Sequence, residues 1–560
     1  MSEQKRIAVA ILLSILSILV FTELRAPKKE IITTNQEQQS ISNPPSIPQN
    51  SIVNNNQVIT PSVNKTNQSN LLDKEQVLNS KKTTIITSKA KYEISHLGAR
   101  FTSLKIIDFK EDLKSKKGVN LIDQNLNLFP PAVFDNNLSD LNVNFQISSL
   151  DNTASSKGED KYILNQSPFT ISFKGNLSNG KEITKSFTFY PDSYLFDLNI
   201  TLDSETTFIE WYDVFEKKLN SYNVRQVSQY INNTKVKRVV DKKADLTPIS
   251  NPSTWITIGD NYFINSLINP NGVKQSSYFK RDNALTIQTA NKNLKIYAGP
   301  NSNKELKKVG FDLPKIIDLG FFAIFGKPLL DLINFFFGIF GNYGLAIVIV
   351  TILIKIFLLP LTKTSFKSMK AMQTLKPEMD ALRKRVTDPK DLQKEMFALY
   401  KKKGVNPLGG CLPMVLQFPI FLGMYNALRS TFELRHADFA LWINDLSSPE
   451  SLEVFGISLP IMILLMGLSM FLQQLTNPST GLDPNAKKMM FFMPIIFTGM
   501  FIIFPFPSGL VLYWLVNNLI SIIQQYSLKS DKFSPLKATF IGSIAIFAIA
   551  FILTLIPWTT

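Results

Sequence analysis

The chain has 560 residues, of which 45% are hydrophobic and only 19% charged, and its formal net charge is +16. This length allows two or three structural units, and the composition is typical of a chain divided between lipid and water. A single cysteine, Cys411, excludes a disulfide framework. With only His96 and His436 available, we expect neither a histidine metal site nor a histidine-based triad, and we predict no cofactor.

The distribution of positive charge points to a membrane surface. Lysine and arginine gather in the loops between apolar segments, and no basic stripe interleaved with aromatic residues occurs in the polar part of the chain. We therefore expect a lipid bilayer as a partner and no direct binding of nucleic acid.

Residues 1–26 predict a membrane anchor. Lys5 and Arg6 precede an apolar run over 7–22, and no small-x-small cleavage site follows it, so we expect an uncleaved span with a cytoplasmic N-terminus. Residues 27–82 contain a stretch rich in Asn, Gln, Ser and Pro, which predicts a flexible linker.

Residues 83–305 predict a large antiparallel β-sandwich outside the cytoplasm. Alternating apolar and polar residues recur between turn signals, and Asn179-Gly180 is the clearest hairpin turn. Helical pattern is sparse before 253–268. Trp211 and Tyr212 either line a ligand groove or, in the alternative we favour, pack in the core.

Residues 313–341 predict an amphipathic helix in the membrane interface. Lys327, Asp331, Asn334 and Gly338 recur at helical spacing along an otherwise apolar segment. The alternative is a full span that is broken at 326–328.

A near-continuous apolar span over 343–360 contains one positive charge, Lys355, with Thr351 one helical turn earlier on the same face. A lysine at such depth costs roughly 3 kcal/mol on insertion scales, so it is a functional hypothesis by default. The alternative is that Lys355 snorkels toward the interface near Lys363.

Residues 363–404 are strongly basic and predict a cytoplasmic helical hairpin. Asp388-Pro389 supplies a cap and a first-turn proline for its second helix. Its methionine-rich seam either packs the two helices together, which we favour, or receives a partner.

Four further apolar segments complete a predicted five-span core over 343–529, and a last run predicts an extra span over 538–558. The core segments after the first are 412–427, 457–475, 489–504 and 510–526. The acidic balance of 429–455 predicts a loop outside the cytoplasm.

Polar residues inside these spans suggest a hydrophilic cavity. Lys355, Thr351, Gln417 and the asparagines at 517 and 518 are available to line it, and Lys355 makes it positive. The alternative is that these side chains only bond the helices together. No P-loop or protease constellation occurs, so we do not predict an enzyme.

Several sequence strings, in this order, resemble the YidC/Oxa/Alb family of membrane protein insertases of the Gram-negative type. The strings are WITIGDNYF, YAGP, PLTKTSFKSMKAMQTLKP, YKKKGVNPLGGCLPMVLQFPIF, ELRHADFALWINDLS, FFMPIIFT and FPSGLVLYW. The resemblance is close over 313–529 and looser over the β domain.

The resemblance implies a bacterial inner-membrane protein with a periplasmic β domain that inserts and helps to fold newly made membrane proteins. It implies a substrate groove in which Lys355 stands where the family has an arginine and Trp514 where many relatives have a tyrosine. The implied groove residues are Lys355, Thr351, Gln417, Tyr513 and Trp514, to which the polar residues of the last core span add Asn517. An implied apolar slide contains Met489, Met493, Phe497 and Met500.

The partners implied are nascent membrane proteins, the Sec translocon, and the ribosome or signal recognition machinery. An alternative function is a secondary transporter or anion channel that uses the same positive cavity, although the sequence shows no internal repeat.

Overall fold

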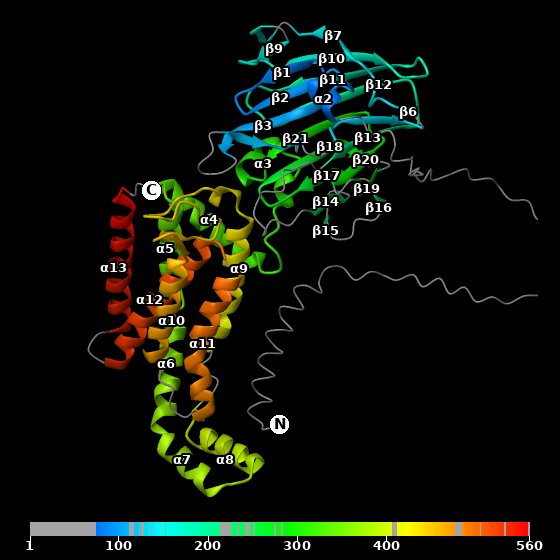
Figure 1. The fold of residues 1–560 in the computed structure, drawn as a ribbon. Coiled ribbons are helices and arrows are strands. Elements are labelled where there is room, and N and C mark those ends of the chain that lie inside the picture. Colours follow the sequence, from blue (N-terminus) through cyan, green and yellow to red (C-terminus); the bar gives the residue numbers. More distant parts are fainter. Residues whose placement is uncertain are drawn as a thin grey trace, which may run out of the picture. The chain divides into compact units, whose positions relative to one another are not determined.

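The computed structural model describes residues 74–557, apart from 111–116, 123, 125–127, 137, 152, 159, 213–225, 232–234, 241–246, 250–252, 274–275, 282–283, 406–411, 477–483, 505 and 531–533. The predicted anchor and most of the predicted linker lie outside these residues. The described part is β-rich up to residue 300 and almost entirely helical after it (Figure 1). This division confirms the predicted fold class of apolar helices with a large antiparallel β domain.

The β domain contains three large sheets. Their strands are β1 (Lys82–Ile86), β2 (Ala90–Ser95), β3 (Arg100–Lys110), β4 (Gly118–Asn120), β5 (Ala132–Asp135), β6 (Leu138–Ser139), β7 (Gln146–Leu150), β8 (Ser155–Ser156), β9 (Lys161–Ile163), β10 (Phe169–Asn176), β11 (Glu182–Phe189), β12 (Leu195–Leu202), β13 (Thr207–Tyr212), β14 (Gln226–Ile231), β15 (Lys235–Val240), β16 (Thr247–Ile249), β17 (Ser253–Gly259), β18 (Phe263–Val273), β19 (Ser276–Arg281), β20 (Ala284–Thr289) and β21 (Asn293–Pro300).

Most neighbouring strands in these sheets are antiparallel. A nine-stranded sheet runs β15-β14-β17-β18-β21-β12-β11-β10-β7, and two six-stranded sheets run β4-β3-β2-β1-β9-β8 and β16-β19-β20-β13-β5-β6. The pairing of β1 with β9 is parallel.

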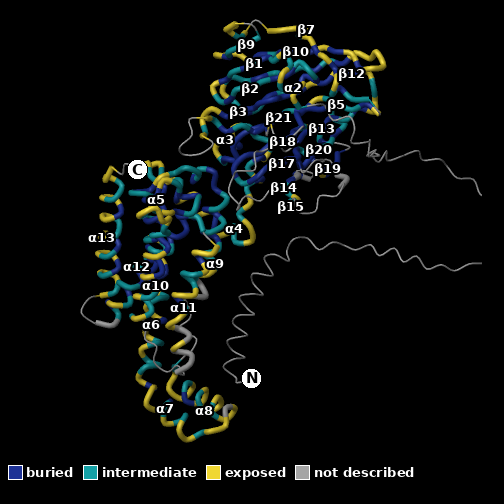
Figure 2. The backbone as a smooth tube through the Cα atoms, viewed as in Figure 1, coloured by how far each residue is buried: buried dark blue, intermediate teal, exposed yellow. Residues whose placement is uncertain are grey.

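The core of the β domain forms where the three sheets meet. Phe101 of β3 contacts Phe187 of β11 at 5.3 Å between ring centroids and Trp211 of β13 at 6.1 Å. Trp211 and Tyr212 are both buried, which confirms core packing over the alternative of a ligand groove. Burial in Figure 2 is correspondingly densest along the strands of this domain.

The hairpin turn at Asn179-Gly180 is confirmed. It joins β10 to β11, with Gly180 at a φ of 83° and the Asn179 side chain accepting a hydrogen bond of 3.0 Å from the Lys181 amide. In contrast, the helical pattern over 253–268 is wrong, because this segment forms β17 and β18. Both faces of these strands are largely buried, so their sequence lacks strict alternation.

Short helices flank the β domain. Helix α2 (Lys74–Asn79) occupies the end of the predicted linker and buries Val77, and α3 (Asn303–Val309) follows the last strand. The predicted amphipathic helix is divided into η3 (Leu313–Ile316) and α4 (Ala323–Phe340). Helix α4 continues through Pro328, so there is no break at 326–328.

The remaining helices form the bundle and the hairpin. They are α5 (Tyr343–Phe357), α6 (Leu359–Thr374), α7 (Lys376–Arg385), α8 (Pro389–Lys402), α9 (Leu412–Ser430), α10 (Ile461–Thr476), α11 (Pro484–Ile503), α12 (Ser508–Ser530) and α13 (Pro535–Leu555). A 3-10 helix, η5 (Phe432–Leu434), follows α9, and a two-stranded sheet of β22 (Leu452–Val454) and β23 (Ile457–Leu459) precedes α10.

The first predicted core span is bent. Helices α5 and α6 meet at an angle of 56° around Leu358. Pro360 lies in the first turn of α6, where its ring lacks an amide hydrogen and conflicts with the carbonyl four residues earlier. Lys355 therefore lies in the last turn before this bend.

The predicted hairpin is formed mainly by α7 and α8. Met379 is fully buried together with Leu375 and Leu399, so the methionine-rich seam packs the hairpin's own helices. The Asp388 side chain accepts hydrogen bonds from the amides of Lys390 and Asp391, which confirms the predicted cap of α8. The outer face of the hairpin is exposed (Figure 2).

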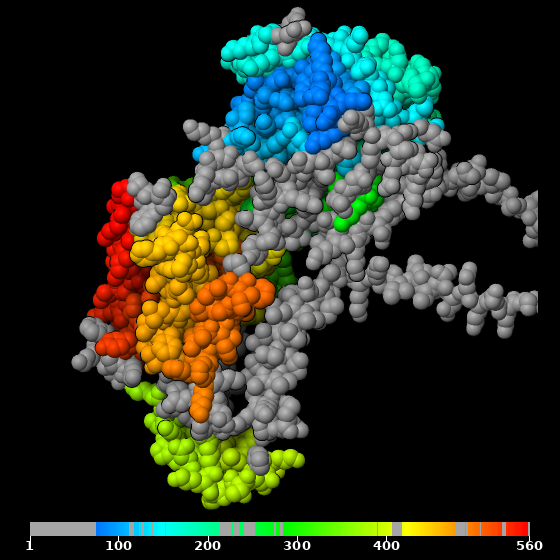
Figure 3. Space-filling model, viewed as in Figure 1, coloured from blue at the N-terminus to red at the C-terminus, as the bar shows by residue number. Residues whose placement is uncertain are grey.

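Within the described residues, α4 and α13 are each long and apolar enough to cross a membrane, and the bent pair α5–α6 is a third candidate. Helix α13 begins at an N-cap, Ser534, and packs against α5 and α12 (Figure 1). Its exposed surface, in red, lies at the edge of the helical part in Figure 3. The number of core spans stays a prediction.

Candidate functional site

Lys355 points into the helical bundle. Its side chain is 7% exposed, and its ammonium donates a hydrogen bond of 2.6 Å to Ser521 Oγ of α12. Ser521 in turn donates to the Asn517 carbonyl oxygen of the same helix at 2.8 Å. The ammonium is thus directed at a neighbouring helix and not along its own helix toward Lys363.

A second hydrogen bond joins α9 to the same stretch of α12. Gln417 Nε2 donates to Asn517 Oδ1 at 2.6 Å, so the polar contacts of α5 and α9 meet on neighbouring residues of α12. We call Lys355, Ser521, Asn517 and Gln417 the polar network. Asn518 bonds elsewhere, because its Nδ2 donates to Ser469 Oγ of α10 at 3.0 Å.

The spacing of polar residues along α12 explains how this helix forms hydrogen bonds with more than one neighbouring helix. Asn517, Ser521 and Gln524 follow at intervals of four and three, which places them on one face of the helix. All three are buried. Burying such groups in an apolar bundle is costly unless partners or water satisfy them, so this face of α12 is polar at an energetic cost.

The other expected groove residues have different surroundings. Thr351 is fully buried, but its hydroxyl donates to the Ile347 carbonyl oxygen of its own helix at 2.7 Å. Tyr513 is buried one turn before Asn517. Trp514 is half-buried and packs against Phe421 of α9, with ring centroids 4.6 Å apart. The structure thus joins Lys355, Gln417 and Asn517 through the polar network but places Trp514 among aromatic rings.

The expected apolar slide lies on α11. Phe497 is half-buried, 6.4 Å from the Trp514 ring, while Met493 is half-buried and Met500 is 37% exposed. The side chain of Met489 lies outside the described residues. The slide and the expected groove therefore meet at Trp514.

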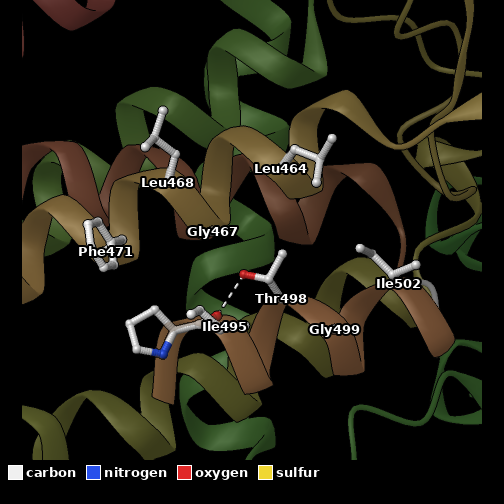
Figure 4. Close-up of a pocket in the computed structure, with 9 residues that line it drawn as sticks. Leu464, Gly467, Leu468, Phe471, Ile495, Thr498, Gly499 and Ile502 are labelled. Carbon is white, nitrogen blue, oxygen red and sulfur yellow. Dashed lines mark hydrogen bonds between the residues drawn. The ribbon is translucent and has the colours of Figure 1, made fainter. Parts of the chain in front are cut away.

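An open pocket of about 390 Å³ lies between α10 and α11 (Figure 4). Its lining is almost wholly apolar and includes two glycines, Gly467 and Gly499. The single hydroxyl in the close-up, that of Thr498, donates to the Pro494 carbonyl oxygen at 2.7 Å. The wall offers no charged group, so it suits an apolar chain.

The segment between α9 and α10 packs over the N-terminal ends of α5 and α12. Asn342 Nδ2 donates to the Phe439 carbonyl oxygen at 2.9 Å, and Ser508 Oγ donates to the Asp445 carbonyl oxygen at 2.7 Å. The buried Glu450 carboxylate accepts from Trp442 Nε1 at 2.7 Å and from the Met462 amide at 2.6 Å. This end of the bundle is closed by hydrogen bonds and packing.

The site contains one buried lysine among neutral polar groups. Among the described residues, the Lys355 side chain has a neutral hydroxyl as its hydrogen-bond partner and forms no ion pair. Among the residues that the structure describes, no group of three or more metal-binding side chains occurs. The network can hold polar or negatively charged segments beside an apolar surface.

Apolar helices with an internal polar network, joined to a large antiparallel β domain, define a multi-pass membrane protein with a domain outside the membrane. Family models agree: residues 82–332 match the YidC periplasmic domain, and 335–534 match the 60Kd inner membrane protein family.

The relatives are membrane protein insertases. The Syntrophobacter fumaroxidans protein is 36% identical over 66% of this chain and 73% of its own length. The Geobacter metallireducens protein is 32% identical over 93% of this chain and 97% of its own. A solved active YidC insertase, with its first transmembrane domain resolved, matches at 19% identity with a TM-score of 0.36, covering 81% of this chain and 93% of that one.

The chain belongs to the YidC family of membrane protein insertases, which confirms the resemblance noted in its sequence. Family membership makes it an inner-membrane protein whose β domain is periplasmic.

Ser521, the hydrogen-bond partner of Lys355, was not among the residues predicted from the sequence. A signal for it existed, because Ser521 follows Asn517 by four residues and so shares its helix face. Phe432 was not predicted either, because its neighbours in space lie more than 100 residues away in sequence.

Proposed function

We propose that this protein inserts newly made proteins into the inner membrane, and helps them to fold, through a positively charged hydrophilic groove formed by α5, α9 and α12. It works without catalysis. The observation that carries the proposal is the buried Lys355 ammonium, which is held between helices by a neutral hydroxyl.

The charge of Lys355 is available to a client chain. An ammonium has three donors, and Ser521 accepts from one of them. The remaining donors favour water or the polar and acidic segments of a client. Gln417 and Asn517 add amide groups along the same path.

Insertion then needs no external energy source at this site. A polar segment is expensive in hydrocarbon, and a wet, charged groove lowers that barrier, while partition of the client's apolar helix into lipid supplies the drive. The apolar face of α11, with Phe497 and Met500, gives that helix a surface beside the groove.

Other components act on the same clients in this proposal. The N-terminus is cytoplasmic, and the basic hairpin of α7 and α8 receives clients on that side. The Sec translocon and the ribosome or signal recognition machinery deliver clients that this chain does not receive alone.

The proposal is tested with the purified protein in liposomes and a single-span client that carries an acidic tail. Lys355→Met should slow insertion by about tenfold or more, because a hydrogen bond to a charged group contributes about 1.5–3 kcal/mol. Lys355→Arg should stay near the parent. Lys537→Met, which changes an exposed lysine in the first turn of α13, is the matched control and should have no effect. Equal insertion by all four proteins would remove the charged groove from the mechanism.

The alternative function, a secondary transporter or anion channel, uses the same positive cavity. It is tested in the same vesicles by anion flux without a client. Our proposal predicts flux at the level of protein-free vesicles for both the parent and Lys355→Met, whereas a channel would conduct and would lose conductance in the variant.

A further inference from the structure

The segment that follows α9 inserts an aromatic side chain into the β domain. Phe432 is 4% exposed and belongs to the same buried cluster as the strands. Its ring meets Phe109 of β3 edge-on, with centroids 4.7 Å apart, and Phe263 of β18 at 5.5 Å. Phe432 therefore packs in the core of the β domain, although it is distant in sequence from the strands that surround it.

Polar contacts surround this aromatic side chain. Glu433 Oε1 accepts a hydrogen bond of 2.9 Å from Ser302 Oγ, just after the last strand. Arg435 donates to the Lys110 carbonyl oxygen at 2.9 Å, and its guanidinium lies 5.4 Å from the Phe263 ring centroid. Together, Phe432, Glu433 and Arg435 form what we call the α9 clamp.

The α9 clamp is coupled directly to α9. The Thr431 hydroxyl donates to the Ala427 carbonyl oxygen of the last turn, and Ser430 Oγ donates to the Asp318 carbonyl oxygen at 2.8 Å. Gln417 lies 13 residues before Ser430 on this helix, about 20 Å away at 1.5 Å per residue. A helix fixed at one end carries that constraint along its length.

We propose that the α9 clamp makes the β domain a positioning element for the groove, because it fixes the end of α9 and so the reach of Gln417 toward Asn517. Phe432 is a positioning residue in this scheme and does not touch the client. The effect on insertion rests on the function proposed above, but the constraint on α9 does not.

Phe455 provides a matched control in the same segment. It lies in the turn between β22 and β23 and is 100% exposed, so Phe455→Ala removes the same ring from a surface position. Arg435→Ala provides a milder change that leaves the Phe432 core contact intact. Phe432→Leu keeps an apolar side chain in the clamp.

The experiment measures amide hydrogen exchange of the full chain in lipid nanodiscs. Phe432→Ala should raise local opening of the last α9 turn and residues 431–436 by about 150- to 5,000-fold, the effect expected when a buried phenylalanine is truncated. Arg435→Ala should give a smaller rise, Phe432→Leu should stay nearer the parent, and Phe455→Ala should match the parent. Exchange in β10, β11 and α12 should not change.

Two results would overturn the proposal. One is exchange at the end of α9 that is the same in Phe432→Ala and Phe455→Ala. The other is faster exchange throughout the β domain in Phe432→Ala together with no change in Arg435→Ala, since Phe432 would then only stabilise the domain core.

Insertion supplies the functional arm. Phe432→Ala should slow insertion, and its effect combined with Gln417→Leu should be smaller than the product of the two single effects, as expected for residues acting through one path. Independent effects would show that the clamp does not act through Gln417. If Lys355 variants insert normally while exchange at α9 rises as stated, the groove proposal fails and the clamp stands.

Discussion

Replacing Gln417 by leucine distinguishes two roles for its hydrogen bond to Asn517. The bond either belongs to a groove that receives clients or only joins two helices of the bundle. The substitution removes the donor of the 2.6 Å bond to Asn517 Oδ1 and keeps a side chain of similar size. Cross-helix hydrogen bonds in membranes contribute about 0.6 kcal/mol on average and at most about 1.7 kcal/mol. The free energy of unfolding of the bundle should therefore fall by less than about 2 kcal/mol.

Insertion should respond more than this small stability change implies. A client segment that loses a groove partner loses about 0.5–1.5 kcal/mol, which corresponds to insertion that is about two- to tenfold slower. Because the bundle remains folded at such a small cost in stability, the loss reports on the groove itself.

The assay pairs a steric-trapping measurement of bundle stability in bilayers with the insertion rate of the acid-tailed client. Gln474→Leu, the same chemical change in the half-buried part of α10, is the control and should leave insertion unchanged. The reasoning is refuted if Gln417→Leu inserts at the parental rate. It is also refuted if insertion falls only in proportion to an unfolded fraction, because the bond would then serve only to join helices.

Three further predictions concern packing and charge. Asp140→Asn should destabilise the β domain by about 3–5 kcal/mol in urea titrations followed by exchange of β11 amides. The substitution removes the negative charge that pairs with the fully buried Lys185 ammonium. Burial lowers the pKa of Lys185 from 10.5 to about 8, so above pH 8 the unfolded chain binds more protons than the folded one. The stability of the β domain should therefore rise from about pH 8 to pH 10.5, by at most about 1.4 kcal/mol per pH unit, and Lys185→Met should abolish that rise. Gly467→Ala should cost about 1–3 kcal/mol in steric trapping, because an added Cβ would lie 2.2 Å from Thr498 Oγ1; unchanged stability would mean that α10 and α11 separate freely.

Local features were readable from the sequence because neighbouring residues determine them. The turn at Asn179-Gly180 needs a residue that tolerates positive φ, and the α8 start needs a capping oxygen, which Asp388 supplies. Both depend on a few consecutive residues. The buried position of Trp211 also followed from its strand-like surroundings and size.

Features that depend on distant residues were not readable. The pairing of Lys355 with Ser521 spans 166 residues, and the contact of Ser302 with Glu433 spans 131. The bend at Leu358 had a local cause in Pro360, but the contacts of α6 with α9 and α12 join segments that are distant in sequence. The strands over 253–268 were misread because burial on both faces removes the alternation that identifies a strand.

The polar network also shows why single-residue expectations were incomplete. A lysine and a glutamine in apolar spans indicated that partners must exist, because each is expensive alone. Which partners they meet depends on the rotation of α12, and one face of that helix supplies both Ser521 and Asn517.

The central claim is that water reaches the position of Lys355 inside the bundle. The most direct measurement replaces Cys411 by serine and compares Lys355→Cys with Leu353→Cys, which lies two residues earlier on α5 and is 40% exposed on its apolar surface. In proteoliposomes, a polar maleimide should label position 355 about tenfold faster than position 353, since a thiolate forms only where water and polar groups surround the sulfur. Equally slow labelling at both positions would contradict the account.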